Sequence, residues 1–309
     1  MFYKETPAER QFRDHYPFFH LHSTPLEDAV LFTNDDDRIV ALNYAAITLG
    51  EVPCKLLAFS IMSNNFHFVL SGENEHVATF WDTFRQRLDI YFTPHGRPGL
   101  LRRISATATP ITDLAQLRNE IAYVIRNRFV ARTDIHVFAD PWSSGGLYFN
   151  PLLKKEGISA ASLQGRKLRD FTHSRLLTAV NPSIYVQDGR AQLWSFVDYL
   201  LVESLYDNAR QFVHSVLKNV EAQVETARRM GERPFLSDEE LFPFVSRYCR
   251  EALQADKVSN LNTQQRKELA TWIKREYAAS NKQLARLSGL SVREINELFP
   301  LSAPEPRNG

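Results

Sequence analysis

The stretch that decides the fold is residues 62–72, which reads MSNNFHFVLSG. Because side chains alternate across a β-strand, Phe66 and Phe68 lie on one face, while Asn65 and His67 share the other. We expect the aromatic face to pack into the core of a domain. The opposite face carries an amide and an imidazole two residues apart, and that polar pair needs a reason: a functional site or, as the alternative, a strand histidine bonded to a neighbour.

The segments around this strand predict an α+β domain over residues 1–150. Alternating and apolar runs predict the strands, and 3.6-residue periodicity predicts the helices. A Pro/Gly-containing loop, TPHGRPGLLRR, separates the last two helices and is a candidate substrate loop. The expected strands cover 18–23, 54–62 and 65–72, and the expected helices cover 35–50, 76–93 and 111–130.

After residue 150 the character of the chain changes. Residues 151–185 are polar and contain Gly and Ser, so we interpret them as a linker or an exposed elaboration. Helical patterns dominate afterwards. They predict a helical region over 186–260 and a final module over 261–309.

Composition places the chain among ordinary globular proteins and narrows its chemistry. Two cysteines, far apart in sequence, predict neither a disulfide framework nor a Cys-based zinc site. The chain contains no run of about 18 apolar residues and no apolar signal-peptide core. We therefore expect a cytoplasmic protein without a membrane partner.

The near-neutral net charge of +1 conceals an uneven distribution. Residues 1–84 hold 5 basic and 12 acidic side chains, whereas residues 85–132 hold 9 basic side chains, all arginine, and 3 acidic ones. Arginine favours forked contacts with phosphate oxygens, so this segment is a candidate channel for a polyanion. A solvated face with local ion pairs is the alternative. The arginines that we expect to contact DNA are Arg102, Arg103, Arg126 and Arg128.

The C-terminal stretch NKQLARLSGLSVREINELF, residues 281–299, matches the helix–turn–helix pattern by position. The pattern needs a small residue where the helices touch, a glycine at the turn and apolar residues that seat the second helix, and the chain supplies Ala285, Gly289, Ile295 and Leu298. An unrelated helical hairpin is the alternative. The residues that we expect to face DNA are Lys282, Arg286, Ser291 as the helix cap, Arg293 and Asn296.

Three pieces of the first 150 residues resemble the small tyrosine transposases of the HUH class, including the REP-associated tyrosine transposases. MSNNFHFVLSG resembles their Met-Pro-Asn-His-hydrophobic-His signature, and FHLHSTPLEDAVLF resembles their first strand and loop. YVIRNRFVARTDIHVFADPWSSGGLYF, residues 123–149, resembles their Tyr-Ile-x-x-Asn-Pro stretch followed by Pro-Trp-Ser-Ser. The resemblance covers about residues 16–150 and implies a ferredoxin-like antiparallel sheet.

The resemblance also implies a set of site residues. Tyr123 takes the position of the nucleophile, His67 and Asn65 those of the two metal-binding histidines, and Asn127 that of a third ligand. Glu120, one turn before the tyrosine, is a further candidate ligand. The metal is Mg²⁺ or Mn²⁺, bound weakly because a neutral amide replaces the first histidine.

Two departures separate this chain from the resembled pattern: Asn65 replaces the first histidine and Arg128 replaces a proline. They are consistent with a lineage that has lost efficient cleavage or with a variant that traps a complex. We treat His20 and His22, on the first strand, as structural.

The resulting hypothesis is a transposase-like protein that binds single-stranded or hairpin DNA and cleaves and rejoins it through a 5′-phosphotyrosine. It would bind duplex DNA through the helix–turn–helix, and a homodimer is compatible with it. Whether the chain is an enzyme stays open. The alternatives are a domesticated, non-catalytic DNA-binding regulator and an RNA-binding protein, since a ferredoxin-like sheet also suits RNA.

Overall fold

The computed structural model describes residues 5–24, 30–131, 136–174, 179–218, 220–234 and 236–300, with the backbone alone for 128–131, 218 and 221. The chain divides into two compact units, Met1–Lys218 and Asn219–Gly309. This boundary falls inside the 186–260 region that we expected to form one helical module.

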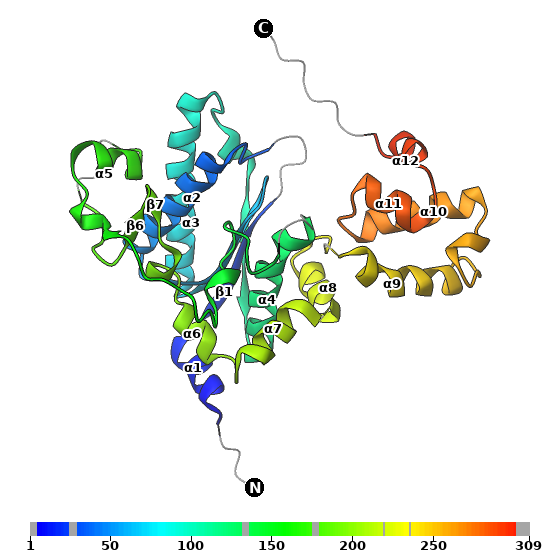
Figure 1. Ribbon diagram of the computed structural model, residues 1–309, viewed down its shortest axis with the longest axis horizontal. Helices are drawn as coiled ribbons and strands as arrows, with labels where there is room; N and C mark the ends of the chain where they lie inside the picture. The colour runs from blue at the N-terminus through cyan, green and yellow to red at the C-terminus, as the bar shows by residue number, and fades with distance from the viewer. Residues whose placement is uncertain are drawn as a thin grey trace. The chain divides into compact units, whose positions relative to one another are not determined.

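The first unit is built on a four-stranded antiparallel sheet (Figure 1). The strand order is β2–β3–β1–β4. Three strands match the predicted ones, and the fourth, ATATPI, is an addition. It is an edge strand in which only the last residue is fully buried, and edge strands tolerate its proline. The strands are β1 (Phe18–Ser23), β2 (Lys55–Ile61), β3 (Phe66–Ser71) and β4 (Ala106–Ile111).

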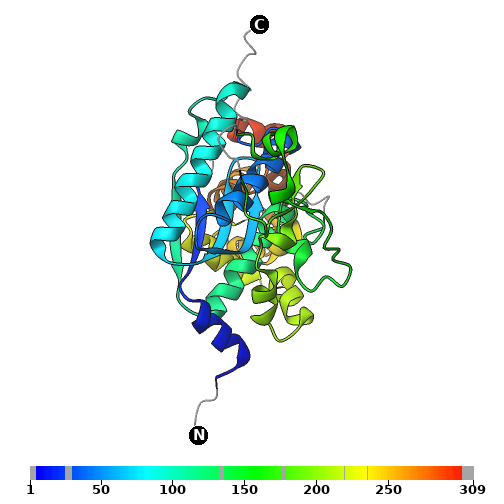
Figure 2. The same cartoon turned by 90° about the vertical axis from the view of Figure 1, so that its left-hand side faces the viewer.

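Different helices cover the two faces of this sheet (Figures 1 and 2). On one face, Phe66 and Phe68 of β3 meet Phe84 and Phe80 of a helix edge to face, with ring centroids 5.4 Å apart in both pairs. The other face packs against a single helix on β2 and β3. The first face is covered by α2 (Asp35–Leu49) and α3 (Asn74–Phe92), and the second by α4 (Leu114–Ala131).

Local signals set the start and rotation of α4. The Asp113 carboxylate accepts a hydrogen bond from the Gln116 amide at 2.8 Å, and the Gln116 side chain accepts one from the Thr112 amide at 3.0 Å. The two bonds form half of a capping box, with the Gln116 side chain bound to the amide one residue before the cap. The apolar stripe that turns α4 onto the sheet is fully buried and consists of Leu117, Ile121, Val124 and Ile125.

The free edge of β2 is closed by the Pro-Trp-Ser-Ser segment. Phe59 and Ser144 bond twice: the Phe59 amide donates to Ser144 Oγ at 3.0 Å, and the Ser144 amide donates to the Phe59 carbonyl at 3.1 Å. Tyr148 donates from its hydroxyl to the Leu57 carbonyl, and its burial raises the pKa of this phenol. This segment extends the sheet laterally and has a structural role.

Residues 151–185 are packed against the first unit and do not form a free linker, apart from 175–178, which lie outside the described residues. The buried Phe171 of this segment accepts at its carbonyl from the Asn43 side chain of α2 at 3.4 Å, and the Asn181 side chain donates to the Gly50 carbonyl at 3.2 Å. The segment is thus the elaboration that was one of our two interpretations. It contains β5 (Ile158–Ser159) and α5 (Gly165–Thr172), and the chain continues into β6 (Tyr185–Gln187) and β7 (Arg190–Ala191).

Three further helices complete the first unit: α1 (Pro7–His15), α6 (Tyr199–Ser204) and α7 (Ala209–Lys218). α7 packs against the outer side of α4. The expected substrate loop contains two 3₁₀ turns, Thr93–His95 and Leu100–Arg103, and Leu101 is fully buried. Arg97 anchors this loop through a two-pronged ion pair to Asp37, with N–O distances of 2.8 and 2.7 Å.

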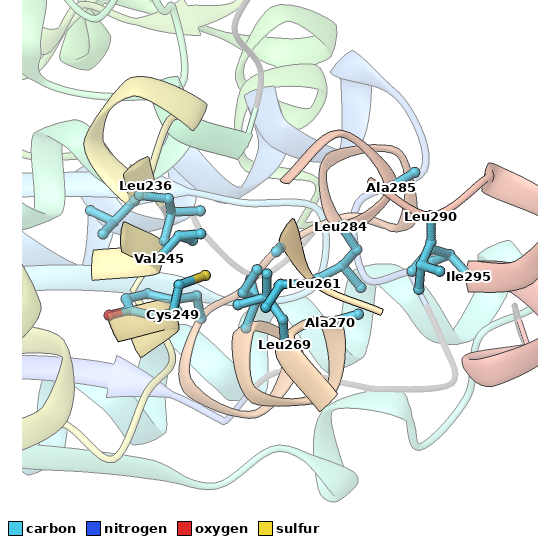
Figure 3. Packing of buried hydrophobic residues seen from close by; sticks show 14 of the residues in the cluster. Leu236, Val245, Cys249, Leu261, Leu269, Ala270, Leu284, Ala285, Leu290 and Ile295 are labelled. Carbon is cyan, nitrogen blue, oxygen red and sulfur yellow. The ribbon is translucent and has the colours of Figure 1, made fainter. Parts of the chain in front are cut away.

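The second unit is helical and closes around one apolar cluster (Figure 3). Leu269 and Ile273 of one helix are fully buried beside Leu284 and Ile295 of the two that follow. None of the helices in the described part of the chain is long and apolar enough to cross a membrane. The helices are α8 (Val220–Arg229), α9 (Asp238–Glu251), α10 (Thr263–Glu276), α11 (Asn281–Ser288) and α12 (Val292–Leu298).

Candidate functional site

Residues of two segments about 60 positions apart meet between α4 and β3. The segments were identified separately from sequence, and each of the five residues is at most 7% exposed. The structure places them on one side of the sheet, opposite the phenylalanine face. They are Asn65, directly before β3, His67 on β3, and Glu120, Tyr123 and Asn127 on α4.

A chain of hydrogen bonds begins at Glu120 and ends at two amides. Glu120 Oε2 lies 2.7 Å from His20 Nδ1, and His20 Nε2 lies 3.2 Å from His67 Nδ1. His67 Nε2 lies 3.1 Å from Nδ2 of Asn65 and 3.1 Å from Nδ2 of Asn127. All these side chains are buried, so the bonds form away from bulk water.

The direction of the chain follows from its carboxylate end. A carboxylate only accepts, so His20 donates through Nδ1–H and its Nε2 is the acceptor. His67 then donates through Nδ1–H, which leaves the lone pair of its Nε2 facing the two amide groups. In this direction of donation each imidazole has one tautomer, and the bonds on both sides of the ring hold His67 in place.

Glu120 occupies a different position from the one we expected. Its carboxylate binds His20 and is separated from His67 Nε2 by two imidazole rings. A carboxylate behind a histidine orients the ring and makes its far nitrogen more basic, as in the outer shell of metal sites. Glu120 is therefore a positioning residue for His67 and not one of the groups around Nε2.

The groups around His67 Nε2 have the spacing of neighbouring ligands of one ion. In octahedral coordination with bonds of about 2.1 to 2.2 Å, adjacent donor atoms lie about 3 Å apart. Both amide groups lie 3.1 Å from the imidazole nitrogen, and turning either amide over replaces its nitrogen with its oxygen. His67, Asn65 and Asn127 therefore fit a cation that accepts one nitrogen and two neutral oxygens, such as Mn²⁺.

Charge makes this a weak site. Among the described residues, no cluster of three or more His, Cys, Asp or Glu side chains has the geometry to hold a metal ion. The candidate ligands supply no negative charge, because the one carboxylate nearby, Glu120, serves His20. The prediction of weak binding stays a prediction, now with this physical reason.

Ser60 adds a polar atom to the same face of the sheet. It lies directly opposite His67 in the pairing of β2 with β3, is completely buried, and its Oγ has no hydrogen-bond partner among the described residues. Directly opposite residues have Cβ atoms about 5 Å apart. An unpaired buried hydroxyl costs free energy, so this atom is available to hydrogen-bond a group beside His67.

Tyr123 packs edge-on against two imidazoles. Its ring centroid lies 6.0 Å from that of His20 and 6.0 Å from that of His67, at interplanar angles of 62° and 82°. The side chain is 3% exposed. His22 adds a third imidazole to this cluster, since its ring lies nearly parallel to that of His67 with centroids 6.2 Å apart.

His20 and His22 belong to the site, although the sequence led us to treat them as structural. The spacing His-x-His on the first strand was a usable signal, because both side chains had to share one face. Its meaning depended on the pairing of β1 with β3, which sets His22 opposite His67. That pairing is non-local and cannot be derived from either strand alone.

The arginine-rich segment does not form a single surface. Arg126 is 4% exposed, lies between α4 and α7 and donates to the Val216 carbonyl at 3.5 Å, so its expected role in a DNA channel is wrong in this fold. Arg102 and Arg103 are exposed on the second 3₁₀ turn, in keeping with the expectation. Arg128 lies on α4, but its side chain is outside the described residues.

In the second unit, α11 and α12 join through a tight turn at Gly289, which has φ +70°. Ser291 caps α12 by accepting from the Glu294 amide, as predicted. Asn296 is partly engaged, because its Oδ1 accepts from Asn281 at 2.9 Å. The glycine is required, since a Cβ there would be strained and would lie 2.8 Å from Arg266.

The basic side chains of α11 and α12 differ in exposure and in their ion-pair partners. Arg286 bonds twice to Asp238, at 2.6 and 3.1 Å, and this hydrogen bonding lowers the pKa of the Asp238 carboxyl. Arg293 is 89% exposed and meets only Glu297 of its own helix, at 3.1 Å. Lys282 is exposed on α11. Lys282 and Arg293 are thus the accessible basic contacts of this helix pair, whereas Arg286 is held by Asp238.

Comparison of the chain with protein-family models, with curated proteins and with solved structures finds no match.

Proposed function

We propose that this protein binds single-stranded or hairpin DNA and cleaves and rejoins it with Tyr123 as the nucleophile. One observation carries the proposal: the helix-borne tyrosine packs against a histidine whose outward nitrogen meets two amide groups at 3.1 Å. A nucleophile, an oriented imidazole and oxygen donors in one buried cluster are the parts that phosphoryl transfer needs.

The step balances without any other protein nucleophile. The Tyr123 oxygen forms a bond to phosphorus and loses its proton, while the bond from phosphorus to the 3′ oxygen breaks and that oxygen gains a proton. The products are a 5′-phosphotyrosine and a free 3′-OH. Rejoining is the reverse, with a 3′-OH attacking the phosphotyrosine.

The chain supplies the orientation for this step. Glu120 holds His20, and His20 holds His67, so that Nε2 of His67 faces the amides of Asn65 and Asn127. A divalent cation bound by these three residues would neutralise the phosphate oxygens and align them for attack. The unpaired hydroxyl of Ser60 offers a further hydrogen bond to an oxygen of the substrate.

The architecture supports the same proposal at the level of the fold. The strand order β2–β3–β1–β4, with α2 and α3 together on one face, fits a ferredoxin-like sheet and leaves the other face for α4. The turn at Gly289 and the cap at Ser291 fit a helix–turn–helix with α12 as the recognition helix. Lys282, Arg286, Arg293 and Asn296 are its proposed DNA contacts, and fold alone does not decide function.

The test is the formation of a covalent adduct. The full chain is incubated with labelled hairpin DNA and Mn²⁺, and denaturing gels then reveal DNA that stays attached to the protein. We expect an adduct with the wild-type chain and none with Tyr123→Phe. Tyr44→Phe is the matched control, since Tyr44 is equally buried, on α2. An adduct that survives in Tyr123→Phe would remove Tyr123 from the proposal.

A second function, non-catalytic DNA binding, is favoured by a specific observation. Tyr123 is 3% exposed, and the lone pair of His67 is covered by two amide N–H groups. In this arrangement the site is closed, while exposed Arg102 and Arg293 can still bind DNA. Tight hairpin binding without an adduct in Mn²⁺ would select this second function.

A further inference from the structure

A groove outside the site runs between the outer side of α4 and the first turns of α7. It encloses a cavity of about 500 Å³ and is lined mainly by polar side chains. No carboxylate lines it among the described residues; Asp207, next to it in sequence, is not part of the lining. Its polar residues are Arg118, Asn119, Asn208, Arg210, Gln211, His214 and Ser215.

Two amides of this groove have a fixed orientation. Asn208 Oδ1 accepts from the Gln211 backbone amide at 3.0 Å, and Gln211 Oε1 accepts from the Asp207 backbone amide at 2.7 Å. A backbone N–H only donates, so the oxygen of each side chain must face it. The NH₂ groups of Asn208 and Gln211 are therefore left to donate elsewhere.

The two arginines add donors of the same kind. Arg118 uses Nε to bond the Leu205 carbonyl at 2.6 Å, and its ring neighbour is Tyr206, so the guanidinium is held in place. Its two Nη groups have no partner among the described residues. Arg210 is exposed on the first turn of α7, near the positive end of the helix dipole. The groove thus presents donors and positive charge to an acceptor-only ligand.

The groove adjoins the position of Tyr123. Asn119 lines the groove and Tyr123 follows it by four residues on the same helix, so their Cβ atoms are about 6 Å apart. That separation is comparable with the step between successive phosphates of a DNA strand. Once the closed site opens to admit a strand at Tyr123, the neighbouring part of that strand would pass within reach of the groove.

We propose that the α4–α7 groove binds backbone phosphate groups of a single DNA strand that continues from the site. The inference rests on the proposed function for its choice of ligand, since DNA is the polyanion handled next to it. Phosphate oxygens accept several hydrogen bonds and carry the charge that the groove lacks. Base identity plays no part in this contact.

The test measures binding of labelled oligothymidine by fluorescence anisotropy at several salt concentrations, in the Tyr123→Phe background so that no adduct forms. We expect Arg210→Gln to weaken binding about three- to tenfold and to flatten the slope of log K against log salt by about 0.7. Arg169→Gln is the matched control, because Arg169 is an exposed arginine on α5 and is not part of the groove. Its affinity and slope should stay at the background value.

A second probe separates phosphate contacts from other effects. On an oligothymidine with neutral methylphosphonate linkages, the difference between Arg210→Gln and the background protein should disappear. A difference that persists there, or equal losses in Arg210→Gln and Arg169→Gln, would overturn the inference. A further contrary result would come from competition with inorganic phosphate at matched ionic strength. If phosphate binding depended on Arg210 while strand binding did not, the inference would also be overturned.

The two proposals fail in distinguishable ways. An Arg210 effect on strand binding, in a protein whose wild type gives no adduct, counts against cleavage and supports the groove. A wild-type adduct, combined with strand binding that is indifferent to Arg210, overturns the groove and leaves cleavage intact.

Discussion

The two faces of β3 are made by alternate residues of one short strand, yet they are stabilised in opposite ways. Phe66 and Phe68 pack in an aromatic cluster. The edge-to-face geometry of the ring pairs is the directional feature of this packing. His67, between them, bonds to His20, Asn65 and, across to α4, Asn127. One face is held by buried area, and the other by a chain of hydrogen bonds.

The two faces differ in how strictly they fix the positions of their side chains. Apolar packing stabilises the sheet, but core side chains can be exchanged at modest cost in stability when their total volume is conserved. A buried polar chain fixes the position and tautomer of each ring, because a broken bond leaves a buried group unsatisfied. The His67 face is therefore the one suited to chemistry, and the phenylalanine face supports it.

The largest effect is expected on the aromatic face. Phe68→Ala removes a side chain that is 1% exposed, and it should lower the free energy of unfolding by about 3–5 kcal/mol. Urea denaturation followed by circular dichroism measures this. Phe68→Leu, which keeps most of the volume, should cost clearly less, and equal losses in the two variants would contradict packing as the cause.

The second-largest loss of stability is expected at the ion pair between Arg97 and Asp37 of α2. Arg97→Met leaves the 1% exposed carboxylate of Asp37 without its guanidinium and should cost about 3 kcal/mol at neutral pH. Burial alone would raise the pKa of Asp37, but hydrogen bonds from Arg97 and Thr33 outweigh it and lower the pKa.

The sign of the pH dependence follows from that lowered pKa. The stabilisation is present above the unfolded-state value of about 4 and is lost as pH falls through the folded-state pKa. Wild type and Arg97→Met should therefore converge in acid. A gap between their unfolding free energies that stays constant from neutral to acid pH would contradict the assignment.

A smaller effect is expected on the polar face. Glu120→Ala leaves the Nδ1–H of His20 buried without its acceptor, which should cost about 1–3 kcal/mol in unfolding free energy. Glu120→Gln retains an acceptor oxygen and should recover much of that loss. Failure of the glutamine variant to exceed the alanine variant would show that the chain does not depend on this bond.

The sequence predicted the elements better than the connections between them. Periodicity alone located β1 to β3 and α4, and it placed Glu120, Tyr123 and Asn127 on one side of the helix. It missed β4, whose Ala and Thr residues give a weak apolar signal, and it could not locate the unit boundary at Lys218. Alternation along the strand was enough to set Asn65 and His67 apart from the phenylalanines.

Non-local packing explains the remaining differences. His20 reaches the site only because β1 pairs with β3. Arg126 is buried because α7, about 90 residues later, covers that side of α4. Neither contact can be derived from the local sequence. The prediction for Arg126 was based on the local charge count, which does not show that α7 covers this side chain.

The smallest effect on stability is expected on the exposed face of α12. Arg293→Ala removes a side chain that is 89% exposed and should change the unfolding free energy by less than about 0.5 kcal/mol. If Arg293 reads a base edge, discrimination between target and random duplex should fall by about 1–3 kcal/mol. Equal losses of affinity on both duplexes would make it a phosphate contact instead.

The central claim is that His67 is oriented toward a metal position that lacks one strong ligand, because an amide stands at Asn65. Calorimetric titration with Mn²⁺ of the wild type, Asn65→His and Asn65→His combined with His67→Ala tests it most directly. Imidazole binds Mn²⁺ more strongly than a neutral amide, so Asn65→His should bind at least about tenfold more tightly than the wild type. The double variant should lose that gain. Equal Mn²⁺ affinity in the wild type and Asn65→His would contradict the claim.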